Sequence, residues 1–126
     1  MKILFDTDVL IEYLRGNETV LKGMRNLVEG EHILAFTPIT SAEIYRGARS
    51  NEKSKTEALL GSLECLELDA KVGKRAGEYL RSYSRSHGVE LVDALIAAAA
   101  HVHKFSLCTF NWKHYPMSEI ERYSLL

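Results

Sequence analysis

The chain has 126 residues, of which 46% are hydrophobic and 26% are charged, and its formal net charge is −1. These values are typical of one globular domain with a real core, and two cysteines are too few for a disulfide framework. The near-zero net charge excludes a globally basic nucleic-acid-binding protein, so any contact with nucleic acid must come from a local patch.

The first third of the chain predicts a strand, two helices and a second strand. The apolar run Lys2–Phe5 ends at an acid, which is typical of a short buried strand. Apolar residues at helical spacing then predict a helix that Gly16 stops. Asn17 can cap a second helix, and the apolar segment His32–Phe36 predicts the next strand. The buried face of the second helix is predicted to consist of Val20, Leu21, Met24, Leu27 and Val28.

The middle of the chain predicts two further helices and a third strand. Pro38 favours an extended entry, after which Thr40 opens a helix that reaches about Arg49. Asn51 can cap the helix that follows. We therefore expect a helix at Glu52–Leu63 and then a strand at Leu63–Leu68.

The last part of the chain predicts the longest helix and an alanine-rich helix. Asp69 can cap the longest helix, and Gly88 ends it. The remaining elements are predicted as a helix at Leu91–His103, a strand at Phe105–Thr109 and a fifth strand at Ile120–Leu125.

Strands that alternate with helices indicate βαβ crossovers, which produce a parallel sheet covered by helices on both faces. We therefore predict an α/β protein, with a single three-layer α/β/α domain over residues 1–126 and a mostly parallel central sheet of four or five strands. The longest apolar run, Ala94–Ala100, is far too short to cross a membrane. No targeting signal is visible, so we expect a cytoplasmic protein with no membrane contact.

Polar residues follow the predicted strands and open the predicted helices. Asp6 ends the first strand and Asn111 lies just past the fourth, and ligands of parallel sheets bind beyond the carboxyl ends of strands. Glu43 and Asp93 fall in the first turns of helices, where the helix dipole favours anions. Clustered carboxylates are the ligands that Mg²⁺ or Mn²⁺ needs for phosphodiester hydrolysis. The combination predicts a metal-dependent nuclease.

Each acid also has a purely structural interpretation. Glu43 is three residues after Thr40 and would complete a capping box with it. Asp93 would complement the helix dipole, which stabilises a helix by about 0.3–1 kcal/mol. Asp8 is interpreted as a helix-start residue rather than a ligand. Asp6 is harder to explain in this way, because a carboxylate that ends a buried strand must be solvated, paired or metal-bound.

Four segments carry a pattern of motifs in a fixed order. Ile3–Leu14 holds a hydrophobic–Asp–Thr–x–hydrophobic start, Ile39–Ala48 and Val92–Ala98 each hold one acid, and Leu107–Tyr115 follows. Together these segments resemble the motifs of PIN-domain ribonucleases, specifically the VapC-type toxins of prokaryotic toxin–antitoxin pairs. The resemblance spans the full chain, and it implies a PIN-like fold and a divalent-metal-dependent endoribonuclease.

The resemblance also implies roles for individual residues. Asp6, Glu43 and Asp93 are expected to bind the catalytic ion, Mg²⁺ or Mn²⁺, which hard oxygen ligands favour over Zn²⁺. Thr7 and Thr109 occupy hydroxyl positions that flank the site.

Two positions depart from the family pattern. Asn111 completes the expected catalytic set, but it is an amide where many relatives place an acid. His114 likewise stands where family members often carry an acid. These departures leave three carboxylates to hold metal.

RNA contacts are expected on both sides of the acids. Arg46, Lys113 and His114 are candidates for contact with the RNA backbone, and Trp112 and Tyr115 for stacking on bases. A surface ion pair is the alternative for Arg46. Packing at the edge of the fold is the alternative for Trp112 and Tyr115.

Two other functions compete with the nuclease. The run Asp6-Thr7-Asp8 partly resembles the start of a haloacid-dehalogenase phosphatase, although Val9-Leu10-Ile11 replaces the Gly-Thr expected there. A catalytically weak PIN module that binds RNA or a protein is the non-enzyme alternative, and Asn111 favours it. The resemblance further implies a homodimer and a cognate VapB-type antitoxin, with RNA as the substrate.

Overall fold

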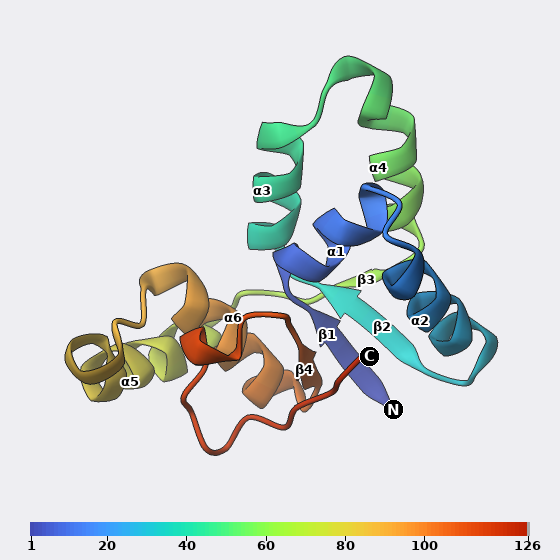
Figure 1. Ribbon diagram of the computed structural model, residues 1–126. Helices are drawn as coiled ribbons and strands as arrows, with labels where there is room; N and C mark the ends of the chain where they lie inside the picture. Colours follow the sequence, from blue (N-terminus) through green and yellow to red (C-terminus); the bar gives the residue numbers. More distant parts are fainter. Residues whose placement is uncertain (126) are drawn as a thin grey trace.

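The computed structural model describes residues 1–125, which contain a four-stranded parallel sheet (Figure 1). The strands are β1 (Lys2–Phe5), β2 (Ile33–Phe36), β3 (Glu64–Cys65) and β4 (Ser106–Cys108). Their spatial order is β3-β2-β1-β4, so β1 is an interior strand. Strands β2 and β3 are added on one side of β1, and β4 is then added on its other side. The strand order therefore reverses at β1, where parallel sheets open a ligand crevice.

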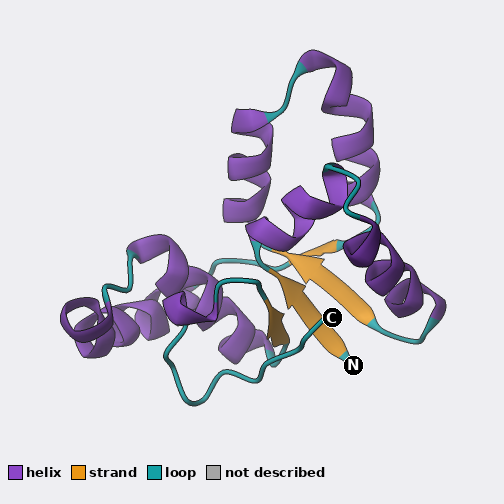
Figure 2. Ribbon diagram, in the orientation of Figure 1, coloured by secondary structure: helices purple, strands orange, loops and turns teal. Residues whose placement is uncertain are grey.

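Helices cover both faces of the sheet (Figures 1 and 2). One layer consists of α1 (Thr7–Leu14), α2 (Glu18–Glu29), α3 (Pro38–Gly47) and α4 (Lys53–Gly61). The other layer consists of α5 (Ala70–His87) and α6 (Leu91–His103). Two short 3₁₀ helices, η1 (Ser50–Glu52) and η2 (Trp112–His114), complete the helical elements.

Alternation along β1 divides the core into two parts. Ile3 and Phe5 pack with the α1–α4 layer, whereas Leu4 packs with the α5–α6 layer, as the two-residue period of a strand requires. All three side chains are fully buried. The small side chains of Ala97–Ala100 are also fully buried and allow α6 to lie close against the sheet. This two-sided burial explains the almost continuous apolar sequence of β1 and α6.

The predicted fold class is confirmed, with four strands in the sheet of the described residues. The cap predictions for α5 are also correct, because Asp69 accepts a hydrogen bond from the amide of Val72 and Gly88 adopts a φ of 64°. Within residues 1–125, no helix has both the length and the apolar character needed to span a bilayer. The single-domain assignment over 1–126 stays a prediction, and its last residue, Leu126, lies outside the described residues.

The start of α3 was predicted incorrectly. The helix begins at Pro38 rather than Thr40 and ends at Gly47. Proline suits the first helical position because it has no N–H to satisfy and its φ is already helical. Thr40 is therefore a fully buried residue of the first turn, not the cap.

Four further elements differ from the predictions at their ends. The turn at Asn51 is part of η1, so α4 begins at Lys53 and ends at Gly61. The strand predicted at Leu63–Leu68 is reduced to β3, because the chain beyond Leu66 turns toward the cap of α5. The other boundary differences are shifts of one residue at the ends of β2 and β4.

The predicted fifth strand is a single bridge between Leu107 and Arg122. Pairing does not extend further, because Leu125 packs against α2 at Gly23 instead of continuing along β4. A Cβ added at Gly23 would lie 2.8 Å from Cγ of Leu125, so glycine is what permits this contact. The close packing therefore explains a glycine in the interior of α2, where it otherwise weakens a helix.

Candidate active site

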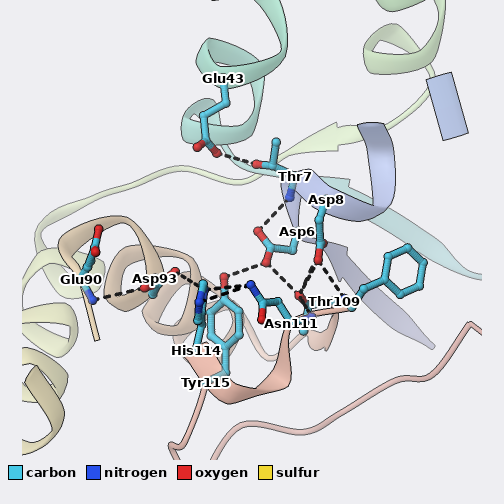
Figure 3. A network of polar contacts seen from close by, with 11 residues as sticks. Asp6, Thr7, Asp8, Glu43, Glu90, Asp93, Thr109, Asn111, His114 and Tyr115 are labelled. Atoms are coloured by element: carbon cyan, nitrogen blue, oxygen red, sulfur yellow. Dashed lines mark hydrogen bonds and ion pairs between the residues drawn. The ribbon is translucent and has the colours of Figure 1, made fainter. Parts of the chain in front are cut away.

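Asp6 lies at the carboxyl end of β1, where the strand order reverses. Its carboxylate caps α1 by accepting a hydrogen bond from the amide of Thr7 at Oδ1, over 2.8 Å. Its other oxygen, Oδ2, accepts hydrogen bonds from the hydroxyls of Thr109 and Tyr115, both over 2.9 Å (Figure 3). All three donors are neutral. They orient the carboxylate without cancelling its charge.

Tyr115 was expected either to stack on bases or to pack at the edge of the fold. Its side chain is 1% exposed and belongs to the core cluster on the α5–α6 side, so the packing alternative is correct. The sequence interpretation missed its hydroxyl, which reaches Asp6 from 109 positions along the chain. Local sequence patterns carry no signal for such a contact.

Glu43 extends from α3 toward the start of α1. Its Oε1 accepts a hydrogen bond from the hydroxyl of Thr7 over 2.6 Å, and the same hydroxyl lies 2.9 Å from that of Thr40. The predicted capping box between Thr40 and Glu43 is wrong, because α3 begins two residues earlier and Thr37 holds the cap position. Glu43 is therefore free of a capping role, and its carboxylate faces Asp6 and Thr7 (Figure 3).

Asp93 has both a structural and an outward-facing oxygen. Its Oδ2 accepts a hydrogen bond from the amide of Glu90 over 3.2 Å, which forms a capping box at the start of α6. Its Oδ1 lies 3.6 Å from Nδ1 of His114, and the Asn111 amide nitrogen lies 3.2 Å from the same ring atom. The structural interpretation of Asp93 is therefore correct for one oxygen, and the other remains on the side of Asp6 (Figure 3).

Asp8 is a fourth acid at this end of the sheet. It lies in the first turn of α1, as predicted, but its Oδ2 also accepts a hydrogen bond from the amide of Phe110 over 3.0 Å. The hydroxyl of Thr109 lies 3.3 Å from the same oxygen. Asp8 thus ties α1 to the segment that follows β4. The spacing Asp6-Thr7-Asp8 was the available signal that both acids leave the same strand end.

Burial and mutual repulsion alter the acidity of these groups. Burial is the main cause that raises the pKa of Asp8, and the charge of Asp6 raises it further. Burial also raises the pKa of Asp93, while His114 acts in the opposite direction and Asp6 adds to the increase. For Tyr115, burial and then the charge of Asp6 raise the pKa, so its hydroxyl stays protonated and remains a donor.

The donor set fits Mg²⁺ or Mn²⁺ in its chemistry, because it offers carboxylate oxygens and no sulfur. Within residues 1–125, no three His, Cys, Asp or Glu side chains lie close enough together to hold an ion unaided. Mg²⁺ does not require such a cage, because it keeps several waters and binds through one or two carboxylates plus substrate phosphate. Asp6, Asp93 and Glu43 come from the start of α1, from α6 and from α3, and all three lie at the same end of the sheet (Figure 3). Their assignment as metal ligands stays a prediction.

The candidate RNA-contacting residues lie at the rim. Arg46 is exposed on α3 and forms no ion pair with any of residues 1–125, so the surface-pair alternative fails. Lys113 and His114 are exposed on η2. The guanidinium of Arg122 lies 4.7 Å from the ring centre of Trp112, which packs at the edge of the α5–α6 core. An RNA-binding role for Arg46, Lys113 and His114 stays a prediction.

Residues 3–120 match the family described as PIN domain. The chain belongs to the PIN-domain family. It is 38% identical over 120 residues to Ribonuclease VapC10 of Mycobacterium tuberculosis, an alignment that covers 93% of this chain and 88% of that relative. The resemblance to VapC-type PIN domains is therefore confirmed, and the family match argues against the haloacid-dehalogenase alternative.

Solved structures share the same fold. VapBC2 from Rickettsia felis, crystallised with a DNA fragment from its promoter, superposes with a TM-score of 0.84 at 22% identity and covers 98% of each chain. A toxin–antitoxin complex from Klebsiella pneumoniae superposes with a TM-score of 0.77 at 23% identity and covers 94% of each chain. At these identities the likeness concerns the fold of this PIN domain.

Proposed function

We propose that this PIN-domain protein is a divalent-metal-dependent endoribonuclease that acts in the cytoplasm as the toxin of a VapBC-type pair. The observation that supports the proposal is the placement of Asp6, Glu43 and Asp93, from three separate elements, around the carboxyl end of β1 (Figure 3). The similarity to Ribonuclease VapC10 supports RNA as the substrate.

Some residues of the site supply negative charge, and others hold those charged side chains in position. Asp6, Glu43 and Asp93 would hold Mg²⁺ or Mn²⁺, which when bound neutralises phosphate charge and acidifies a bound water. The hydroxyl of Thr7 holds Glu43 in place, and that of Thr109 holds Asp6. Backbone hydrogen bonds to Asp6 and Asp93 anchor the two acids to the starts of α1 and α6, which keeps them on rigid elements.

Residues at the rim of the site are suited to positioning the RNA substrate. Asn111 and His114 contact each other beside Asp93, and we assign them to orienting the phosphate or an attacking water, not to holding charge. Exposed Lys113 and Arg46 lie on η2 and α3, at two borders of the acids, and are suited to backbone phosphates of the RNA.

The negative charge of the site is suited to binding an inhibitory partner that carries a positive charge. Asp6, Asp8, Glu43 and Asp93 face few cations, so a protein segment with an arginine can neutralise them and exclude metal. We propose a VapB-type antitoxin as that partner and a homodimer as the toxin's assembly. The VapBC2 and Klebsiella pneumoniae complexes support this proposal by their fold.

The test incubates antitoxin-free protein with total cellular RNA and Mn²⁺ or Mg²⁺, beside an EDTA control. Asp93→Asn keeps an acceptor for the Glu90 amide and removes the charge, so the cap survives while the site is altered. Asp69→Asn is the matched control, because Asp69 caps α5 through Val72 and takes no part in the site. We expect discrete, metal-dependent fragments from the wild type and Asp69→Asn, and none from Asp93→Asn.

Intact RNA in all reactions at high protein concentration would contradict the proposal. The specific observation that would then favour a non-catalytic RNA- or protein-binding PIN module is Asn111, which brings no negative charge to the site. Cleavage that persists in EDTA would contradict the metal dependence alone.

A further inference from the structure

The hydrogen bonds to Asp6 are distributed unevenly between its two oxygens. A carboxylate offers about four lone-pair directions, two on each oxygen. Oδ2 accepts from both Thr109 and Tyr115, which uses both of its directions. Within the described part of the chain, residues 1–125, Oδ1 accepts from the amide of Thr7 alone, which leaves one direction open. Asp6 is thereby prepared to act through a single oxygen.

The two donors to Oδ2 are not equivalent. The Thr109 hydroxyl has one proton, yet it lies within 2.9 Å of Asp6 and 3.3 Å of Asp8, and it also accepts from the amide of Asn111. The hydroxyl of Tyr115 has Asp6 as its hydrogen-bond partner among residues 1–125. When the Thr109 proton turns toward Asp8, Tyr115 still holds Oδ2.

The ring and the hydroxyl of Tyr115 have separable roles. The ring is 1% exposed and fills the core on the α5–α6 side, a task that phenylalanine would perform with the same shape. The hydroxyl alone reaches the site (Figure 3). A buried hydroxyl needs a partner, and here the partner is the carboxylate at the end of the central strand.

We propose that Tyr115 is a positioning residue that occupies Oδ2 of Asp6 and so presents Oδ1 as the single oxygen available to the divalent ion. The inference rests on the proposed function. It adds a residue from the segment after η2 to the machinery of the site, although that residue touches neither substrate nor ion.

A second tyrosine provides a matched control. Tyr79 on α5 is 5% exposed, and its hydroxyl also donates to a carboxylate, that of Glu119. Glu119 is paired with Arg75 and His101 and lies outside the site. Tyr79→Phe therefore removes the same chemical contact from the same kind of environment, without touching Asp6.

The experiment measures Mn²⁺ binding to RNA-free protein by electron paramagnetic resonance for the wild type, Tyr115→Phe and Tyr79→Phe. We expect Tyr115→Phe to weaken Mn²⁺ binding about 10-fold, as is typical when a residue that orients a metal ligand is lost. Tyr79→Phe should bind as the wild type does. Thr109→Val removes the other donor to Oδ2 and should also weaken binding.

Cleavage assays supply a second readout. If Tyr115 acts by positioning Asp6, raising the Mn²⁺ concentration should restore the rate of Tyr115→Phe toward that of the wild type, and the KM for RNA should stay unchanged. A purely structural role would instead lower the melting temperature of both tyrosine variants and leave the Mn²⁺ affinity of each intact. That result would overturn the inference.

Failure of the inference can be told apart from failure of the proposed function. Equal Mn²⁺ affinity in the wild type and Tyr115→Phe overturns only the role of Tyr115. A wild type that binds no Mn²⁺ at millimolar concentration and cleaves RNA equally well in EDTA overturns the metal-dependent function and, with it, this inference.

Discussion

Two carboxylates in this molecule, the half-buried Asp6 and the exposed Glu119, are held in opposite ways. Glu119 borders a cavity of about 660 Å³ beside α5 and α6, and its Oε1 lies 3.5 Å from Arg75 and 3.8 Å from His101. The hydroxyl of Tyr79 also donates to it. Among residues 1–125, Asp6 at the carboxyl end of β1 is bound only by an amide and two hydroxyls.

The contrast separates orientation from neutralisation. The guanidinium of Arg75 beside Glu119 offsets its negative charge, so this carboxylate attracts a further cation less strongly. Neutral donors fix the direction of Asp6 but leave its charge in place, and the nearby acids increase the negative potential further. A site that must attract a divalent ion needs the second arrangement, and a site that must only stabilise the fold can use the first.

Catalysis should distinguish the two carboxylates most strongly. Asp6→Asn should lower the rate of RNA cleavage on the order of 10³-fold, because several kcal/mol of charge stabilisation in the transition state are lost. Glu119→Gln should leave the rate within about twofold, since the glutamate lies away from the reacting groups. Single-turnover cleavage at saturating Mn²⁺ measures both, and comparable losses in the two variants would show that the contrast has no bearing on catalysis.

The stability of the metal-free protein should change in the opposite direction: removing a charge from the acidic site should stabilise it. Asp8, the acid next to Asp6 in this site, tests this. The pKa of Asp8 is raised above its ordinary value of 3.8, so folding favours its protonated form. Its contribution to stability is full below that ordinary value and is lost as the pH rises through the folded pKa. Asp8→Asn should therefore raise the melting temperature in EDTA at pH 7 by a few degrees, and the gain should shrink as the pH falls toward 4.

Glu119→Gln supplies the opposite sign in the same experiment. It leaves Arg75 without one of its anionic partners, so the melting temperature at pH 7 should fall or stay unchanged. Thermal melts in EDTA across pH 4 to 8 measure both variants. A loss of stability in Asp8→Asn at pH 7 would mean that its bond to Phe110 outweighs the repulsion.

The smallest expected effect concerns two buried hydroxyls. Thr37, which follows β2 at the same end of the sheet as Asp6, is fully buried, and its Oγ1 has no hydrogen-bond partner within residues 1–125. Thr37→Val should increase the free energy of unfolding by about 1 kcal/mol, because an unsatisfied polar atom is replaced by a methyl group. Tyr79→Phe should decrease it, since that hydroxyl is bonded. Urea denaturation measures both changes, and destabilisation by Thr37→Val would indicate a partner for its hydroxyl.

Local chemistry explains how much of this fold was predictable. The strand β1, the caps of α5 and the α/β class follow from patterns a few residues long, which the sequence displays directly. Pro38 was misread because the same residue can extend the chain or occupy the first position of a helix, and only the packing of Thr40 decides between them.

The acids of the candidate site were predictable from the sequence, whereas the groups that hold those acids in place were not. Asp6, Glu43 and Asp93 stand at element ends, where sequence patterns are informative. The hydroxyl contact of Tyr115 and the amide contact of Phe110 depend on how the segment after β4 folds back over the end of β1. Such contacts join residues more than 100 positions apart, and no short pattern encodes them.

Because β1 lies between strands from distant parts of the chain, the site can be completed only after those parts have been synthesised. Asp6 is synthesised near the beginning of the chain, whereas its two hydroxyl donors are 103 and 109 positions later. A nascent chain that has not yet reached β4 therefore contains all four acids but lacks the two hydroxyls that hold Oδ2 of Asp6, and one edge of β1 is still open. Under the proposed function, the full set of hydrogen bonds to Asp6 forms only after the segment that follows β4 has been synthesised and has folded back over the end of β1.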